Sequence, residues 1–177
     1  VLGGAAGTSV SARCLGARTF GSVADEQTSF AILDRFVEAG GTFIDTADNY
    51  VSWIDGYDGS ESERLLGRWL ASRGIRAELV LATKVGALPS QLDDPQSALE
   101  GLSAAVIRGQ AGQSLRRLGT DRIDLYYAHV EDRSVPLAET MGAFAELVAG
   151  GMVRMLGCSN HATWRIERSR AVAREHG

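Results

Sequence analysis

The chain has 177 residues, of which 45% are hydrophobic and 23% are charged, proportions that are typical of a globular domain and exclude disordered and fibrous proteins. Its formal net charge is −4 and its arginines are scattered, so no basic run is available to bind a nucleic acid. No apolar stretch approaches the roughly 20 residues that would cross a bilayer, so we expect no membrane partner.

The beginning of the chain and its two cysteines bear on where the protein works. The first ten residues, VLGGAAGTSV, lack a charged segment followed by an apolar core, so we expect no secretory signal. Cys14 and Cys158 each lie in an apolar run, which indicates two reduced core residues rather than a disulfide. We therefore expect a soluble, cytoplasmic protein, and the sequence gives no indication of its oligomeric state.

The first predicted elements follow a glycine-rich lead-in. Residues 10–15 form the first predicted strand. A helix is then predicted over residues 25–39, because Asp25 can cap its first turn and Gly40-Gly41 can end it. Residues 42–46 (TFIDT) are short, apolar and β-branched, as expected of a second strand.

The rest of the chain repeats this alternation of strand and helix. A polar loop rich in glycine, aspartate and aromatic residues covers residues 49–59, and the next helix opens at Ser60, with Glu63 at the spacing of a capping box. The later elements are a strand over 79–85, a helix over 103–118, a strand over 123–129, a helix over 136–149, a strand over 153–159 and a helix from about 163 to the end.

Five successive βα units with apolar strands predict a parallel sheet that is buried on both faces. A doubly wound dinucleotide-binding fold would carry G-x-G-x-x-G after its first strand, and the residues there, LGARTFGS (15–22), do not match. The pattern therefore favours a (β/α)8 TIM barrel, of which this chain holds about five βα units. No linker divides residues 1–177, so we expect a single domain.

Catalytic groups of such a barrel lie at the carboxyl ends of its strands. Four successive predicted strands end in polar or ionisable groups: Asp45 with Tyr50 just beyond it, Lys84, His129, and Ser159 with Asn160. Each group interrupts or ends an apolar run, where burial without a partner costs several kcal/mol. We expect these side chains to satisfy one another or a ligand, and no metal site is predicted.

This set of groups suggests a mechanism. Asp45 would keep Lys84 charged, and the ammonium would lower the pKa of Tyr50 from about 10 toward neutrality, making the phenol a usable general acid. His129 could donate a second hydrogen bond to a substrate carbonyl. Such a site has no hydride of its own, which implies a nicotinamide cofactor.

Five segments resemble signatures of the aldo-keto reductase family, in the family's order: GGTFIDTADNY (40–50), ESERLLG (61–67), ATK (82–84), DRIDLYYAH (121–129) and GCSN (157–160). The resemblance implies reduction of an aldehyde or ketone with NADP(H), or NAD(H), as cofactor. The family's catalytic tetrad then falls on Asp45, Tyr50, Lys84 and His129.

The same resemblance implies a set of cofactor-binding residues. The family's clamp for the nicotinamide carboxamide falls on Ser159 and Asn160, and Asp45 is also expected to contact the cofactor. Several relatives have threonine at the position of Ala17, beneath the nicotinamide ribose. Ala17 lacks that hydroxyl, whereas Arg18 can still contribute backbone contacts.

The chain departs from the family in length, because family members usually have eight βα units. The later units supply a glutamine and an aromatic residue for the nicotinamide and basic residues for the adenosine 2′-phosphate. Five parallel strands would also leave strand edges open. The chain is therefore expected to be part of a longer protein, a truncated product, or a chain that pairs with another.

Other interpretations stay open at this point. Lys84 could form a Schiff base in an aldolase, although a paired Asp45 would keep the amine protonated. A truncated or non-catalytic relative would bind nucleotide weakly or not at all. Trp53 and Tyr57 either wall a substrate pocket or are surface aromatics, and Trp164 is expected to pack against the barrel.

Overall fold

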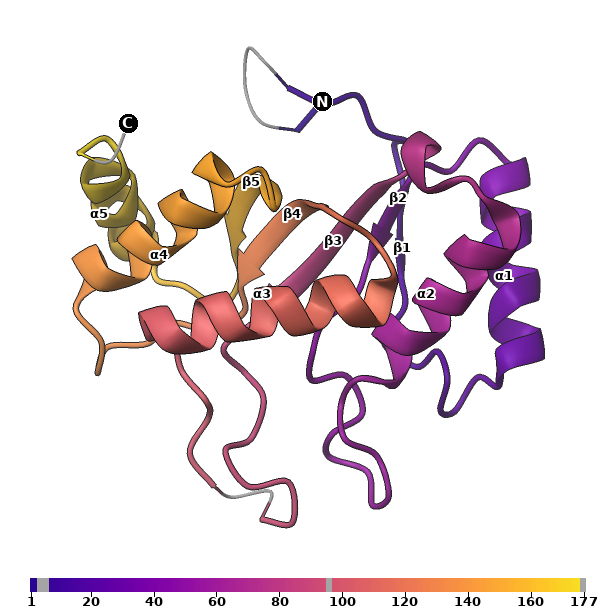
Figure 1. The fold of residues 1–177 in the computed structure, drawn as a ribbon, viewed down its shortest axis with the longest axis horizontal. Coiled ribbons are helices and arrows are strands. Elements are labelled where there is room, and N and C mark those ends of the chain that lie inside the picture. Colours follow the sequence, from indigo (N-terminus) through magenta and orange to yellow (C-terminus); the bar gives the residue numbers. More distant parts are fainter. Residues whose placement is uncertain (3–6, 95–96, 176–177) are drawn as a thin grey trace.

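The computed structural model describes residues 1–2, 7–94 and 97–175, and it shows strands alternating with helices along the whole of that chain (Figure 1). The elements are β1 (Cys14–Gly16), α1 (Glu26–Glu38), β2 (Phe43–Asp45), α2 (Glu61–Arg73), a short 3-10 helix η2 (Arg76–Glu78), β3 (Val80–Val85), α3 (Ala104–Leu118), β4 (Ile123–Ala128), α4 (Leu137–Ala149), β5 (Val153–Cys158) and α5 (Thr163–Ala173).

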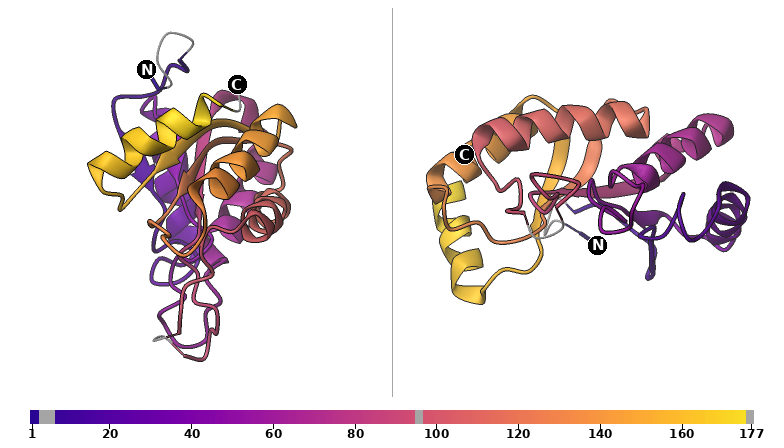
Figure 2. Two further views of the ribbon diagram at one scale, coloured as in Figure 1. Left: turned by 90° about the vertical axis from the view of Figure 1, so that its left-hand side faces the viewer. Right: turned by 90° about the horizontal axis from the view of Figure 1, so that it is seen from below.

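The five strands form one parallel sheet in the order β1-β2-β3-β4-β5. A doubly wound sheet would reverse its order at a switch point, so this sequential order confirms the first five βα units of a (β/α)8 barrel. The helices lie in an arc around one side of the sheet (Figure 2, right). The long loops after β2 and β3 project from the same end of the sheet (Figure 1).

The hydrophobic core lies between the sheet and this arc of helices. One cluster joins Ile44 and Leu81 to Trp69 of α2, and a second joins Tyr126 to Phe144 of α4. Because side chains alternate along a strand, the neighbours of these core residues point to the opposite, concave face. That face carries the polar groups at the carboxyl end of the sheet.

The predicted helix ends were tested by the caps in the structure. The Asp25 side chain accepts a hydrogen bond from the Thr28 amide, as predicted, and Gly119 ends α3 with a left-handed φ of 62°. The predicted capping box at the start of α2 was wrong, because the Ser60 side chain makes no cap hydrogen bond and Glu63 is fully buried. The amides of Asp58 and Gly59 instead donate to the Glu61 carboxylate.

The first strand is shorter than predicted, since β1 begins at Cys14 rather than at residue 10. Before it, the Ser11 amide donates to Thr42 Oγ1 (2.8 Å) and the Thr42 amide donates to Ser11 Oγ (3.0 Å). These side-chain hydrogen bonds replace the backbone ladder that would have extended the strand.

Three predictions of burial were also wrong. Cys14 and Cys158 are free and exposed, because they lie on β1 and β5, the outer strands, each of which has one strand neighbour. Trp164 is 54% exposed on α5, and its ring lies 5.7 Å from the Arg133 guanidinium. Within the described ranges, no helix is both long and apolar enough to cross a membrane.

Candidate active site

Three of the predicted site residues meet at the carboxyl end of β2 and β3. The Lys84 ammonium donates to Asp45 Oδ2 (2.5 Å) and to the Tyr50 hydroxyl (2.8 Å). The Tyr50 hydroxyl donates to the same Asp45 oxygen at 3.2 Å. A third hydrogen bond from Lys84 reaches the carbonyl of Thr46 (2.7 Å), an acceptor that the sequence did not reveal.

The strand register explains how these groups meet. Asp45 is the last residue of β2 and is paired with Ala82, so Lys84 lies two residues farther along β3, beyond the end of β2. The chain then turns sharply and brings Tyr50 back over Lys84. Val51, which follows it, is buried and has a φ of 66°, a left-handed conformation that strains a β-branched residue.

His129 completes the group from the end of β4. Its ring meets the Tyr50 ring edge to face, with centroids 6.2 Å apart. Its Nδ1 atom is buried and has no hydrogen-bond partner among the described residues. Burial and the neighbouring Lys84 ammonium lower the pKa of His129 to about 4, so the imidazole is neutral near pH 7 and keeps one N–H to donate.

The predicted direction of the Tyr50 pKa was wrong. Burial first, and then the Asp45 carboxylate, raise the pKa of Tyr50 above its ordinary value. Burial and the negative charge of Asp45 both disfavour a phenolate, and the hydrogen bond that the phenol donates to Asp45 further stabilises the protonated form. Burial lowers the pKa of Lys84, and Asp45 opposes this change. Tyr50 therefore holds its proton at neutral pH.

The residues predicted for the cofactor lie around this group. The Asn160 side-chain amide donates to the carbonyl of His129 (2.9 Å) and to Ser159 Oγ (3.1 Å), and Asn160 has a φ of 55°. The buried Ala17 amide donates to the carbonyl of Asp45 (2.8 Å). The Arg18 guanidinium lies 4.8 Å from the ring of Trp53, which is 47% exposed.

The donor set at Ser159 and Asn160 suits a primary carboxamide, which needs both a donor and an acceptor. Ser159 offers a hydroxyl, and the Asn160 Oδ1 atom has no partner within the described part of the chain. The residues present therefore fit one end of a nicotinamide. No group of three or more possible metal ligands was found among the described residues.

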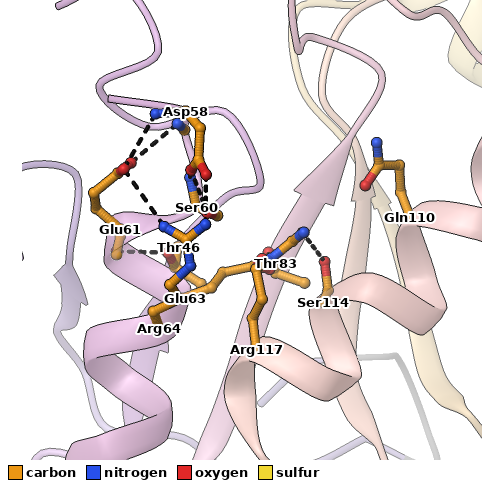
Figure 3. A network of polar contacts seen from close by, with 12 residues as sticks. Thr46, Asp58, Ser60, Glu61, Glu63, Arg64, Thr83, Gln110, Ser114 and Arg117 are labelled. Carbon is orange, nitrogen blue, oxygen red and sulfur yellow. Dashed lines mark hydrogen bonds and ion pairs between the residues drawn. The ribbon is translucent and has the colours of Figure 1, made fainter. Parts of the chain in front are cut away.

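Sequence reasoning missed one residue of the site and a polar network that lies behind it. The Tyr127 ring lies 5.6 Å from Lys84 Nζ on the concave face, a position that the strict alternation of Tyr126 and Tyr127 could have indicated. The network is buried on the side of the sheet that faces the helices (Figure 3). There Glu63 accepts hydrogen bonds from Thr83 Oγ1 (2.6 Å) and Arg117 Nε (2.5 Å), joining α2, β3 and α3.

Comparisons with known proteins agree with this geometry. A model of the aldo/keto reductase family matches residues 14–176. The norsolorinic acid reductase stcV of Emericella nidulans is 42% identical, over 100% of this chain and 46% of its own length. The oxidoreductase YrpG of Bacillus subtilis is 40% identical, over 96% of this chain and 52% of its own length.

A solved structure, the aldo-keto reductase of Bacillus halodurans in its holo form, superposes with a TM-score of 0.75 and is 33% identical. The match covers 90% of this chain and 49% of that chain. The present chain thus spans about half the length of the relatives that it matches. The sequence, the sheet order and these matches agree, and the chain belongs to the aldo-keto reductase family.

Proposed function

We propose that the protein reduces an aldehyde or a ketone to an alcohol, with Tyr50 as the general acid and NADP(H), or NAD(H), as cofactor. One observation carries the proposal: the Lys84 ammonium contacts both the Tyr50 hydroxyl and the Asp45 carboxylate. The family assignment and the norsolorinic acid reductase and oxidoreductase relatives support it.

The nicotinamide would supply the hydride, and the protein groups manage the proton. Tyr50 donates its proton to the carbonyl oxygen as negative charge develops there. The Lys84 ammonium then stabilises the phenolate that is left, and Asp45 keeps Lys84 charged. His129, as a neutral imidazole, donates a hydrogen bond that orients the carbonyl.

Five residues would hold the nicotinamide end of the cofactor. We assign the carboxamide to Ser159 and Asn160, on the strength of their donor and acceptor groups. Asp45, Ala17 and Arg18 border the same end of the sheet, where the Ala17 amide donates to the carbonyl of Asp45, and Arg18 would offer backbone contacts to the cofactor. We also propose a cytoplasmic location, because exposed free thiols such as those of Cys14 and Cys158 persist in a reducing compartment.

The Tyr50→Phe substitution tests the proposal in the full-length protein. Removing the hydroxyl should lower kcat for a test aldehyde by about 10²–10⁴, the usual contribution of a general acid. Affinity for NADPH, followed by fluorescence titration, should stay nearly the same. Tyr57→Phe, a matched change in the same loop, should have normal turnover. Normal turnover in Tyr50→Phe would exclude Tyr50 as the acid.

A non-catalytic relative is the second candidate, and the missing hydroxyl at Ala17 favours it because one expected ribose contact is absent. Binding of NADPH without turnover of any carbonyl compound would support a nucleotide sensor, and no binding would support an inactive relative. The aldolase alternative is disfavoured by the 2.5 Å contact between Lys84 and Asp45. Borohydride trapping of a carbonyl compound on Lys84 would revive it.

A further inference from the structure

A carboxyl group that the mechanism above does not use is buried beside the active site. Asp48 lies in the loop that joins Asp45 to Tyr50, and it is only 2% exposed. Neither of its carboxyl oxygens has a hydrogen-bond donor among the described residues. An ionised carboxylate in such a place would be strongly disfavoured, because a buried charge needs a partner.

Asp48 and Glu100 both lie against the carboxyl end of β3. The Asp48 amide donates to the carbonyl of Lys84 (3.4 Å), and the Gly86 amide, two residues farther along, donates to Glu100. After burial, the charge of Glu100 is the largest cause that raises the pKa of Asp48, and a hydrogen bond between the two side chains adds to it.

Glu100 belongs to the loop between β3 and α3, and both of its oxygens already accept hydrogen bonds. One accepts from the Gly86 amide (2.9 Å) and the other from the Gln110 side chain (2.7 Å). These donors stabilise the charged form of Glu100, so a proton shared by the pair belongs on Asp48.

The charged groups around Asp48 and Glu100 also favour a proton on Asp48. Burial first, then Glu100 and Glu63 of α2, raise the pKa of Asp48, and Arg117 of α3 opposes them. Arg117 already donates to Glu63 and to Ser114, so it leaves the Asp48 carboxyl without compensation (Figure 3).

Two other titratable groups, on neighbouring strands, interact electrostatically with Asp48. Tyr126 of β4 is buried, and its hydroxyl has no partner among the described residues. Lys84 of β3 is already bound to Asp45, Thr46 and Tyr50. Of the three carboxyl groups, those of Glu63 and Glu100 already accept hydrogen bonds, so the Asp48 carboxyl is the one that needs a proton.

We propose that Asp48 carries this proton and donates it to Glu100, and that this hydrogen bond docks the loop bearing Tyr50 onto the loop after β3. Neighbouring contacts belong to the same interface. The Asn49 side chain donates to the carbonyl of Ala87 (3.0 Å). A Cβ atom added at Gly59 would lie 2.9 Å from the Asp48 carbonyl and 3.1 Å from Leu88 Cδ1, so the loops leave no free space there.

Asp48 is thus a positioning residue: it holds the loop that presents the Tyr50 hydroxyl to Lys84. This catalytic consequence rests on the proposed function, whereas the shared proton and the docking do not. At high pH the pair would lose its proton, and two adjacent carboxylates would repel each other. The loop bearing Tyr50 would then be released from the loop after β3.

The first test is a pH titration of the Asp48 side-chain carboxyl by ¹³C NMR in the full-length protein. The resonance should remain that of a protonated carboxylic acid at neutral pH, where an aspartate of ordinary pKa is ionised. Titration of Asp48 near 4 would overturn the proposal. This measurement needs no turnover, so it stands apart from any failure of the proposed reaction.

The second test compares wild type with Asp48→Asn, whose side-chain amide can donate a hydrogen bond to Glu100 at any pH because it has no titratable proton. A carboxyl that is protonated when folded and ionised when unfolded makes the wild type less stable as pH rises. Above pH 4, the folding constant of wild type should fall relative to Asp48→Asn by up to about tenfold per pH unit, until Asp48 ionises. The control Asp55→Asn should show no such trend, and a parallel pH dependence of wild type and Asp48→Asn would contradict the shared proton.

Turnover then tests the positioning role. Asp48→Asn should have a normal kcat near neutral pH. In wild type, kcat should fall at alkaline pH as the Tyr50 loop is released, and this fall should be absent from Asp48→Asn. Asp48→Ala should lower kcat with little change in KM for the carbonyl substrate, because the Tyr50 loop loses its anchor. An unchanged kcat in a folded Asp48→Ala protein, or no rescue by Asn, would overturn the role. If Asp48→Ala does not fold, the pH dependence of kcat in Asp48→Asn, compared with that of wild type, tests the positioning role instead.

Discussion

The Lys84 ammonium has three hydrogens, and in this structure each has an acceptor: Asp45 Oδ2, the Tyr50 hydroxyl and the carbonyl of Thr46. The side chain is therefore fully satisfied although it is almost buried. A neutral amine would lose one of these bonds, and an arginine could not place three donors at one point. The residue type, and not only its charge, is determined by this geometry.

Sequence reasoning brought the right residues together but gave the wrong sign for the pKa of Tyr50. The pattern showed that Lys84, Asp45 and Tyr50 share one end of the sheet. It could not show that the phenol donates to Asp45 while the loop buries it, and both effects favour the protonated form. Positions along strands can be predicted from spacing, whereas the balance of burial and charge needs coordinates.

The lowered pKa of His129 makes a prediction about acid stability. The folded pKa of about 4 is below the ordinary value of 6.5, so the unfolded chain binds more protons between these pH values. The stabilisation is complete above pH 6.5 and is lost as pH falls toward 4. The free energy of unfolding of wild type, measured by chemical denaturation from pH 4 to 8, should therefore fall more steeply below pH 6.5 than that of His129→Asn.

A matched variant separates this effect from general acid denaturation. His161→Asn makes the same chemical change in the nearby loop after β5, where His161 Nδ1 lies 2.6 Å from the carbonyl of Ser159. It should keep the steep dependence of wild type. Identical pH curves for wild type and His129→Asn would show that His129 is not held neutral by burial.

At the scale of elements, the order and type of strands and helices followed from the sequence because their apolar periods are clear. The ends were predicted correctly where one residue decides them, as with Asp25 and Gly119. The ends of elements were predicted wrongly where a residue distant in the sequence determines them. Thr42, which precedes the neighbouring strand β2, exchanges hydrogen bonds with Ser11 before β1, and the Glu63 side chain binds Arg117 of α3 instead of capping α2.

The cap at Asp25 can be tested by Asp25→Ala. The Thr28 amide would lose its acceptor (2.8 Å), so the protein should lose about 1 kcal/mol of unfolding free energy, the typical contribution of an N-cap. Denaturant titration measures this directly. Asp55→Ala changes an exposed aspartate of a loop and should have almost no effect; equal losses in the two variants would mean that the cap contributes nothing.

For the whole molecule, the two faces of the sheet carry different kinds of residue. The face toward the helices holds the hydrophobic clusters and the buried Glu63–Arg117 pair, which ties α2 and α3 to β3. The concave face holds Asp45, Lys84 and Tyr127. Polar residues on both faces were visible in the sequence, but only the structure separates those that bind helices together from those at the proposed active site.

The buried pair should matter more for stability than an exposed pair of the same type. Glu63→Ala leaves Arg117 without its carboxylate and should cost about 3–5 kcal/mol of unfolding free energy. Glu146→Ala breaks the exposed Arg108–Glu146 pair between α3 and α4 and should cost less than about 1 kcal/mol. Chemical denaturation of both variants compares them, and a similar cost would argue against a structural role for the network.

The opposite orientations of Tyr126 and Tyr127 limit how β4 can change over evolution. Tyr126 lies against Phe144 in the core, and the next residue lies near Lys84 on the other face. Inserting or deleting one residue within this strand would exchange every inward and outward side chain beyond that point. Substitutions can therefore accumulate in β4 far more easily than changes in its length.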